Sequence, residues 1–393
     1  MMRSRRLVDG VLVAVVGCLI AGAGEAAIPV SERDALVALY NATGGLSWTE
    51  RQGWLGDAGT ECTWRGVVCD QAGEHVVELQ LWSNNLQGPL PAAISGLSRL
   101  QNAFLCCNHI SGGIPDSIGS LTSLVRLYLY SNELAGPLPE SLGQLANLEE
   151  LRLAYNQIAG NLPAALGGMT KLRQLDLTDN KLTGPLPPGM ASLDALQELD
   201  LAGNDLSGVI PSELAGMAAV QRINLAGNAL TGSIPTELGS ASTLRRLDLG
   251  GNQLTGVIPE GLGDLPNLET LALGSNQLSG SIPGRLGNLA ALVQLYLGPN
   301  QLTGAIPPEL GSLGKLEELS LESNQLTGSI PSQLGSLASL RLLSVQNNQL
   351  VGPLPAELGS LANLESLSLW SNQIDGAIPP QLGNLSKLTW LAA

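Results

Sequence analysis

A period of 24 residues runs through most of this 393-residue chain. Stepping by 24 from Asn84 reaches thirteen positions, and every one is Asn: Asn84, Asn108, Asn132, Asn156, Asn180, Asn204, Asn228, Asn252, Asn276, Asn300, Asn324, Asn348 and Asn372. Gly follows each of them four residues later, and Pro follows seven residues later. Such unbroken self-similarity is typical of stacked repeats, in which each unit packs against its neighbours. The period therefore predicts a repetitive architecture.

Each recurrent position has a structural interpretation. Leu or a close substitute stands eight, five and three residues before each Asn, which predicts a short strand with alternate side chains pointing inward. We expect the Asn amide to satisfy backbone groups where the chain turns inward, because unpaired buried polar groups are costly. The Gly suits a positive φ or a close backbone approach, and the Pro can open a short helical turn.

The pattern LxxLxLxxNxLxGxIPxxLGxL resembles the plant-type leucine-rich repeat over about residues 76–393. The resemblance implies an α/β fold: a right-handed solenoid with a parallel β-sheet on its concave face and short 3-10 or helical turns on its convex face. A second small sheet at the Leu-x-Gly-x-Ile-Pro segment is implied as well. About thirteen repeats and the start of a fourteenth fill this region.

Residues 1–27 predict a secretory signal peptide. Three arginines near the amino terminus precede an apolar stretch from Val11 to Ile20, and small residues follow up to Ala27. An alternative interpretation makes Cys18 a lipoprotein cysteine. The rest of the chain lacks an apolar stretch of the roughly 20 residues that a transmembrane helix needs. We therefore expect a secreted or cell-surface protein.

Residues 28–75 resemble the N-terminal cap of such repeat proteins. Ser31 to Tyr40 predicts an amphipathic helix with Ser31 as its N-cap. The family's C-x-W-x-G-V-x-C segment spans Cys62 to Cys69 and implies a disulfide between these two residues, which an exported chain permits. We expect three tryptophans to cover the end of the core: Trp48, Trp54 and Trp64.

The carboxyl end begins a fourteenth repeat at Leu388 and stops within its strand at Ala393. Terminal repeats usually carry a polar cap. Two explanations stay open: the sequence is a fragment of a longer receptor or surface protein, or a partner covers this edge.

Composition bears on chemistry more than on fold. The formal net charge of −15 argues against nucleic-acid binding, which needs basic patches. With two His residues and no recognised catalytic motif, we predict neither an enzyme nor a cofactor. Cys106 and Cys107 lie near His109 without an evident fourth ligand, so no metal site is predicted. We expect Cys106 to face outward, either as a free thiol or in a vicinal disulfide with Cys107.

The predicted ligand-binding residues occupy variable, solvent-facing strand positions six, four, two and one residue before each Asn. Exposed aromatic side chains on a rigid surface are candidate anchors. The candidates are Trp82, Phe104, Tyr128, Tyr130, Tyr155, Tyr296 and Trp370, together with the charged residues Arg152, Asp176, Asp200 and Asp248. The alternative is a solvated surface without a ligand.

Two finer hypotheses concern the same face. Two residues before the Asn, a run of small residues that includes Ala226, Gly250, Gly274 and Gly298 suggests room for an extended peptide or glycan. Neighbouring aspartates resemble the carboxylate pair of a retaining glycosidase. However, carboxyl groups on exposed strands stay solvated, so we expect the pKa values of these aspartates not to be raised, which argues against catalysis.

The sequence therefore predicts a non-catalytic extracellular recognition module that binds a peptide, protein or glycan on its concave face. It resembles the ectodomains of plant receptor-like kinases. Two alternatives stay open: a surface adhesin or structural spacer, and the truncated ectodomain of a receptor-like kinase. Fifteen Arg against four Lys, with abundant Ala and Gly, favours a GC-rich bacterial or algal source.

Overall fold

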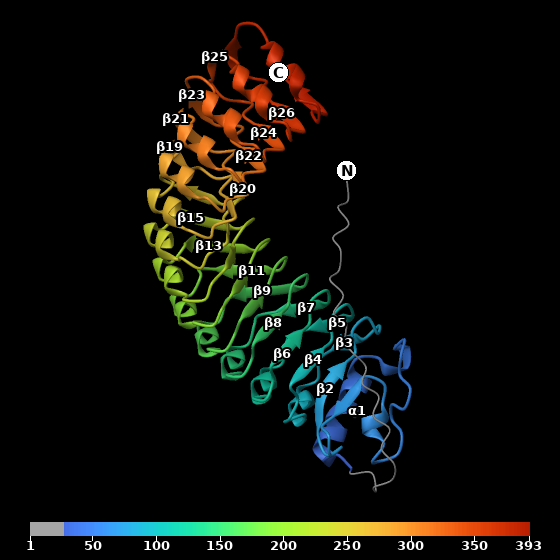
Figure 1. Ribbon diagram of the computed structural model, residues 1–393. Coiled ribbons are helices and arrows are strands. Elements are labelled where there is room, and N and C mark those ends of the chain that lie inside the picture. The colour runs from blue at the N-terminus through green and yellow to red at the C-terminus, as the bar shows by residue number, and fades with distance from the viewer. Residues whose placement is uncertain (1–26) are drawn as a thin grey trace.

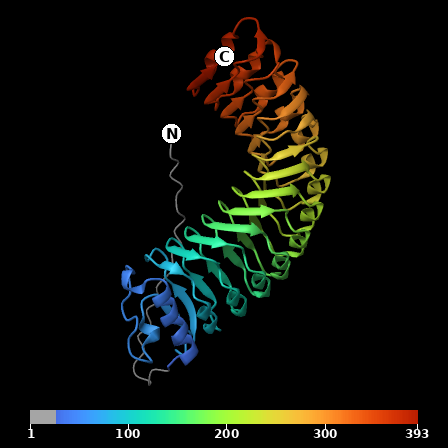
Figure 2. The same cartoon turned by 180° about the vertical axis from the view of Figure 1, so that it is seen from behind.

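The computed structural model describes residues 27–393, so the predicted signal peptide up to residue 26 and the alternative role of Cys18 lie outside it. The chain forms an open, twisted crescent of stacked coils (Figure 1). Short 3-10 helices follow the outer curve, and the strands of one long sheet lie on the inner side (Figure 2). The predicted leucine-rich-repeat solenoid is confirmed.

The long sheet has fifteen strands within residues 27–393. All neighbouring strands are parallel except β1, which is antiparallel to β2. Positions 24 residues apart lie side by side, as Gln174 does with Glu198. The strands are β1 (Val67–Cys69), β2 (Val76–Gln80), β4 (Asn102–Phe104), β6 (Arg126–Tyr128), β8 (Glu150–Arg152), β10 (Gln174–Asp176), β12 (Glu198–Asp200), β14 (Arg222–Asn224), β16 (Arg246–Asp248), β18 (Thr270–Ala272), β20 (Gln294–Tyr296), β22 (Glu318–Ser320), β24 (Leu342–Ser344), β26 (Ser366–Ser368) and β28 (Trp390–Ala392).

A second strand follows each turn and forms a lateral row of smaller sheets with eight, three and two strands. Each of these strands follows one of the recurrent Asn residues and either includes the Gly four residues after that Asn or ends directly before it. All thirteen of these Gly residues have positive φ. The strands are β3 (Gln87–Pro89), β5 (His109–Gly112), β7 (Glu133–Gly136), β9 (Gln157–Asn161), β11 (Lys181–Gly184), β13 (Asp205–Val209), β15 (Ala229–Ser233), β17 (Gln253–Thr255), β19 (Ser279–Ser281), β21 (Gln301–Ala305), β23 (Gln325–Thr327), β25 (Val351–Pro353) and β27 (Gln373–Asp375).

The outer side of each coil is a five-residue 3-10 helix, which begins directly after the recurrent Pro. In the described residues there are thirteen of these, from η3 (Ala92–Gly96) to η15 (Pro380–Asn384). The Pro residues adopt φ values near −65°, as Pro211 does, and this matches the geometry that opens such a turn. The Leu residues of strand and turn fill one continuous core, as the full burial of Leu129 and Leu134 illustrates.

The Asn side chains form a ladder of hydrogen bonds along the interior. Asn204 is typical: its Nδ2 donates to the carbonyls of Leu177 (3.0 Å) and Leu201 (3.0 Å), and its Oδ1 accepts from the backbone N–H of Leu182 (3.0 Å). Two of these partners belong to the preceding coil. Each such Asn therefore closes its own turn and fastens that turn to the neighbouring repeat.

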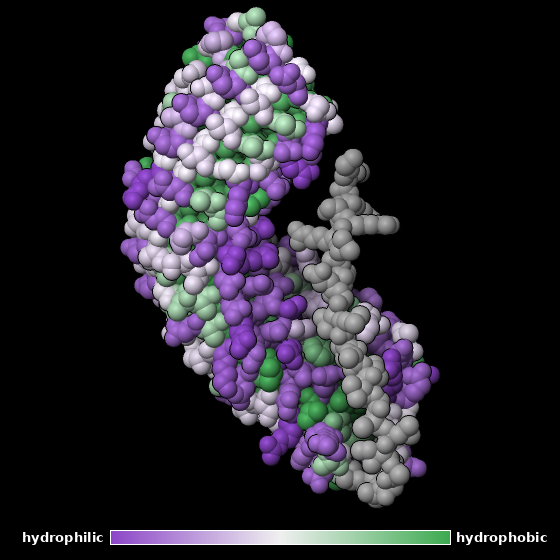
Figure 3. Space-filling view, in the orientation of Figure 1, coloured by the Kyte–Doolittle hydropathy of each residue, from purple (hydrophilic) through white to green (hydrophobic). Residues whose placement is uncertain are grey.

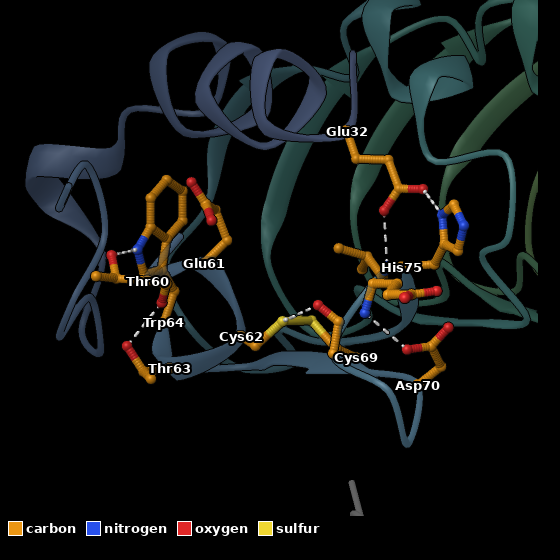
Figure 4. The surroundings of a disulfide bond; sticks show 12 residues. Glu32, Thr60, Glu61, Cys62, Thr63, Trp64, Cys69, Asp70 and His75 are labelled. Atoms are coloured by element: carbon orange, nitrogen blue, oxygen red, sulfur yellow. Dashed lines mark hydrogen bonds and ion pairs between the residues drawn. A yellow bond between two sulfur atoms is a disulfide. The ribbon is translucent and has the colours of Figure 1, made fainter. Parts of the chain in front are cut away.

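The N-terminal cap closes one end of the core. Helix α1 (Val30–Ala42) begins before Ser31, and its N-cap residue is Pro29, so the predicted capping role of Ser31 is wrong. Two short 3-10 turns follow, η1 (Gly45–Ser47) and η2 (Glu61–Thr63). The structure contains the Cys62–Cys69 disulfide (Figure 4). The three cap tryptophans are buried and lie ring against ring.

A buried carboxylate fastens α1 to the first strand of the repeats. Glu32 is almost inaccessible, and it accepts hydrogen bonds from His75 Nδ1 (2.7 Å) and from the backbone N–H of Val76 (2.7 Å; Figure 4). The Asn ladder also begins in the cap, because Asn84 Nδ2 donates to the carbonyl of Glu50 (2.9 Å). The cap is therefore tied to the solenoid at both of these points.

Asn204→Ala tests the ladder. The substitution leaves the buried Leu182 N–H without its acceptor. It also removes one of two Asn donors from the carbonyls of Leu177 and Leu201, which keep their bonds to Asn180 and Asn228. We expect a loss of at least about 1–3 kcal/mol in the free energy of unfolding, measured by urea denaturation. The matched control is Asn147→Ala: Asn147 is exposed and donates to the Thr122 carbonyl (2.9 Å) on the outer side. The control should change stability by no more than about 0.5 kcal/mol. Equal effects of the two substitutions would contradict the ladder's role.

Candidate functional site

The predicted site residues lie on the solvent-facing side of the long sheet, which we call the inner face. Trp82 and Tyr155 are the most exposed aromatic residues near its N-terminal end, with 60% and 49% of their surface accessible. Phe104, Tyr128 and Tyr130 lie between them and are partly exposed. Tyr296, on β20, and Trp370, after β26, are many repeats away. The structure thus brings together five of the seven aromatic candidates and leaves two apart.

Three of these rings form a contiguous aromatic cluster, Phe104, Tyr128 and Tyr130. Phe104 and Tyr128 are paired residues of β4 and β6, and their ring centroids lie 5.0 Å apart. The rings of Tyr128 and Tyr130 are 6.3 Å apart. Both distances fall within the range in which tilted aromatic pairs attract one another. The cluster is therefore held together by ring contacts as well as by the strands.

Arg152 fixes the orientation of the central ring. Its guanidinium carbon lies 4.8 Å from the centroid of Tyr128, close enough for a cation–π interaction. Nη2 of Arg152 also donates to Glu150 Oε2 (3.0 Å) and to Gln174 Oε1 (2.5 Å). The Tyr128 hydroxyl donates to the same Glu150 carboxylate. Tyr128 is consequently held by its ring face and by its hydroxyl group.

A chain of side-chain hydrogen bonds crosses six neighbouring strands beside the aromatic cluster. Asn102 Nδ2 donates to Glu78 (2.9 Å), Arg126 Nη1 to Asn102 (3.1 Å), and Arg126 Nε to Glu150 (3.4 Å). In-register parallel strands place equivalent positions about 4.8 Å apart, which allows these contacts. We call this chain the polar ladder; its members are Glu78, Asn102, Arg126, Glu150, Arg152, Gln174 and Glu198.

Tyr128, Tyr130 and Tyr296 are neutral at physiological pH, because their surroundings raise the pKa of each hydroxyl group. Burial, followed by the hydrogen bond to Glu150, raises the pKa of Tyr128 to about 12. Burial, followed by a hydrogen bond with Cys106, raises the pKa of Tyr130 above its usual value. Burial and the neighbouring Glu318 also raise the pKa of Tyr296. These hydroxyl groups can therefore donate hydrogen bonds, and they add no charge to the surface.

The acidic candidates differ from one another in their partners. Asp200 accepts hydrogen bonds from Thr178 Oγ1 (2.8 Å), Asn224 Nδ2 (2.9 Å) and Arg222 Nη2 (3.1 Å). Asp248 pairs with Arg246 at 3.1 Å. Burial raises the pKa of Asp176, against the expectation that exposed strands leave such carboxylates unshifted. That expectation is wrong at Asp176 because neighbouring side chains of the same face cover it.

The paired cysteines also differ from expectation. Cys106 is buried, with 6% of its surface accessible, and Cys107 is the exposed one. Burial raises the pKa of the Cys106 thiol to about 11. The outward-facing position predicted for Cys106 is therefore wrong, because its small side chain lies below the larger residues at the equivalent positions of the two neighbouring coils. Both cysteines are free thiols, and residues 27–393 hold no cluster of three His, Cys, Asp or Glu side chains suited to a metal.

Two glycines of the small-residue run have a structural explanation. A Cβ on Gly274 would lie 2.2 Å from the carbonyl oxygen of Gly298, and a Cβ on Gly298 would lie 2.1 Å from that of Glu322. Here the absence of a side chain permits close approach of successive coils. The interpretation of these two positions as room for a ligand is therefore wrong.

Sequence reasoning selected Arg152 but missed the rest of the polar ladder. Its residues lie mostly six positions before the Asn, where the sequence shows no aromatic or acidic stripe. The sequence did contain a signal for these contacts, because Asn102, Arg126 and Glu150 stand 24 residues apart and are complementary as hydrogen-bond donors and acceptors. Figure 3 shows hydrophilic side chains gathered along the inner curve in the middle of the molecule.

The regular solenoid of residues 27–393, with one inner strand and one outer 3-10 helix in each coil, defines the class of solenoid repeat proteins. Models of the leucine-rich repeat match residues 123–145, 146–188, 195–217, 242–302, 315–337, 339–361 and 363–385. The chain belongs to the leucine-rich repeat family. These matches indicate no enzyme family, and a search of curated proteins finds no match.

Solved structures of the same fold come from plants and bacteria. PEPR1 in its PEPR1–AtPEP1 complex is 32% identical with a TM-score of 0.72; the match covers 92% of this chain and 58% of that one. The plant peptide hormone receptor RGFR1, in complex with RGF2, is 30% identical with a TM-score of 0.61, covering 83% and 67%. The Leptospira interrogans leucine-rich-repeat protein LIC12759 is 29% identical with a TM-score of 0.55, covering 83% and 92%. None of the helices in residues 27–393 has the length and apolar character to cross a membrane.

Alkaline titration tests the environment of Tyr128. We expect one tyrosine in the ultraviolet difference spectrum to ionise near pH 12, and Tyr128→Phe should remove it. Glu150→Gln should lower the pKa of Tyr128, because it removes one of the raising causes. Since the folded-state pKa lies above the usual 10.0, the associated stability is complete below pH 10 and declines as the pH rises towards 12. An unchanged titration in Glu150→Gln would contradict the assigned contact.

Gly274→Ala tests the close approach of the coils. The added methyl group meets backbone that cannot repack, so we expect a loss of about 1–3 kcal/mol in unfolding free energy. The control is Gly216→Ala, because a Cβ at Gly216 has no heavy atom within 4 Å. Thermal and urea unfolding of both variants provide the measurement. If the two variants were equally stable, the glycine would not serve close packing.

Proposed function

We propose that this chain is a non-catalytic, extracellular recognition module that binds a peptide across the N-terminal part of its inner face. The observation that carries the proposal is the exposure of Trp82 and Tyr155 on either side of a fixed aromatic cluster. Exposed aromatic side chains on a rigid scaffold are favourable anchors because they bury a large area with little loss of conformational freedom.

The order of the residues along the chain fits this role. We infer that residues 1–27 direct export and are removed, that residues 28–75 cap the core, and that the repeats from residue 76 onward supply the binding face. The cap carries a disulfide, and disulfides form and persist in oxidising, extracytoplasmic compartments. Export would place the inner face where extracellular ligands can reach it.

The geometry of the sheet favours an extended ligand. The strands before Trp82 and Tyr155, β2 and β8, are separated by three strand spacings, or about 14 Å in all. An extended peptide advances about 3.3 Å per residue, so roughly four residues would cross this part of the face. The likeness to a plant peptide hormone receptor supports a peptide as the class of ligand.

Peptide selection tests the proposal. The exported chain, immobilised, is exposed to a random display library of short peptides, and the enriched peptides are measured by calorimetry. Trp82→Ala should weaken their binding by about tenfold or more, which corresponds to about 1.4 kcal/mol. The control is Val209→Ala, because Val209 is equally exposed, at 60%, but lies on the lateral sheet. It should leave affinity within about twofold. Absence of any enriched peptide, or equal sensitivity to both substitutions, would contradict the proposal.

A further inference from the structure

The charges beside the aromatic cluster are compensated within the protein. Two carboxylates, Glu78 and Glu150, stand against two guanidinium groups, Arg126 and Arg152, so this group of four is formally neutral. Glu150 alone accepts from both arginines. Glu78 accepts from Asn102 (2.9 Å) and from Gln80 (2.5 Å). Three of the four charges stand in ion pairs, whereas Glu78 bonds only to neutral amides. A charged ligand therefore meets no net charge among these four residues.

The side chains of this region are also held in place. Arg152 contacts Tyr128, Glu150 and Gln174 at once, so an anionic ligand group would have to break several existing contacts to recruit it. The Nε atom of Arg152 has no acceptor, but it is buried beneath its neighbours, where a ligand oxygen does not reach it. Breaking paired and partly desolvated charges is unfavourable, because each partner is left uncompensated.

The remaining accessible surface is aromatic and uncharged. Trp82 has no aromatic partner among the described ring pairs and is 60% exposed. Tyr128 and Tyr130 stay protonated far above neutral pH because burial raises their pKa values. Such a surface gains most by burying an apolar side chain.

Resting on the function proposed above, we propose that the surface between Trp82 and Tyr155 binds an uncharged peptide segment anchored by one aromatic or aliphatic side chain. Binding there is insensitive to ionic strength. The anchor packs against Trp82 and the aromatic cluster. The part of the polar ladder beside it, from Glu78 to Arg152, serves as a rigid border whose charges sum to zero. A peptide is favoured over a neutral sugar because sugar hydroxyls need several free polar partners. The ladder's polar groups already bond to one another.

The test uses three display libraries of short peptides: uncharged, enriched in Lys and Arg, and enriched in Asp and Glu. We expect enrichment from the uncharged library of peptides that contain Trp, Phe or Leu. Their Kd should change by less than about twofold between 0.1 M and 1 M salt, over which the screening length falls from about 10 Å to about 3 Å. Trp82→Ala should weaken them about tenfold, and Trp82→Phe should retain most of the affinity.

A matched control comes from the same face. Trp370 also stands two residues before a ladder Asn and is 44% exposed, but it lies near the other end of the crescent. Trp370→Ala should leave Kd unchanged within about twofold. Because Trp82 and Trp370 are both surface residues, circular dichroism should confirm that either variant is folded before binding is measured.

A second variant tests the charge balance directly. Arg152→Gln leaves Glu150 with one guanidinium fewer, so selection should shift towards peptides that contain Lys or Arg, and their binding should weaken with salt. Strong enrichment from a charged library by the unaltered protein, with a Kd that rises steeply in 1 M salt, would overturn this inference while leaving peptide recognition intact. Binding only to a neutral glycan array, abolished by Trp82→Ala, would overturn both the peptide anchor and the proposed peptide function.

Discussion

The structure depends on one buried hydrogen-bonding group, the amide of the recurrent Asn. At the end of each inner strand the chain must turn into the core, and this leaves backbone carbonyls and N–H groups away from water. The amide satisfies them, as Asn204 does for Leu177, Leu201 and Leu182. Because two of those partners belong to the preceding coil, the amide that closes one turn also sets the register of that turn against the preceding coil. The same residue thereby fixes both the shape of the repeat and the direction of stacking.

Strict register converts each sequence position into a column on the surface. Residues 24 apart become neighbours at the spacing of strands, so the character of the inner face is decided column by column. Complementary choices in one column, joined by Arg152 from the adjacent column, give the polar ladder from Glu78 to Glu198. Aromatic choices in adjacent columns give the cluster of Phe104, Tyr128 and Tyr130. Glycine further along the column of Tyr130 allows backbones to approach, as at Gly274.

On the function proposed above, these columns explain how a rigid scaffold can select its ligand. Rigid strands hold the aromatic rings in place before a ligand arrives, so ordering them at binding costs little conformational freedom. On the same proposal, the charge balance around Glu150 bears on which ligands the surface rejects as well as on which it accepts. The likeness to plant and bacterial leucine-rich-repeat proteins concerns the scaffold, and a shared scaffold does not by itself fix a ligand.

The sequence by itself determined the solenoid, the turn chemistry of Asn, Gly and Pro, and the face on which variable residues lie. These follow from a repeating local pattern, and local patterns can be read without coordinates. The tertiary structure alone decided what each variable residue contacts. Cys106 is buried instead of outward, burial raises the pKa of Asp176, and Glu150 joins two arginines and a tyrosine. The physical reason is that burial and pairing on this face depend on side-chain size and direction in neighbouring coils, which lie 24 residues away in sequence and about 4.8 Å away in space.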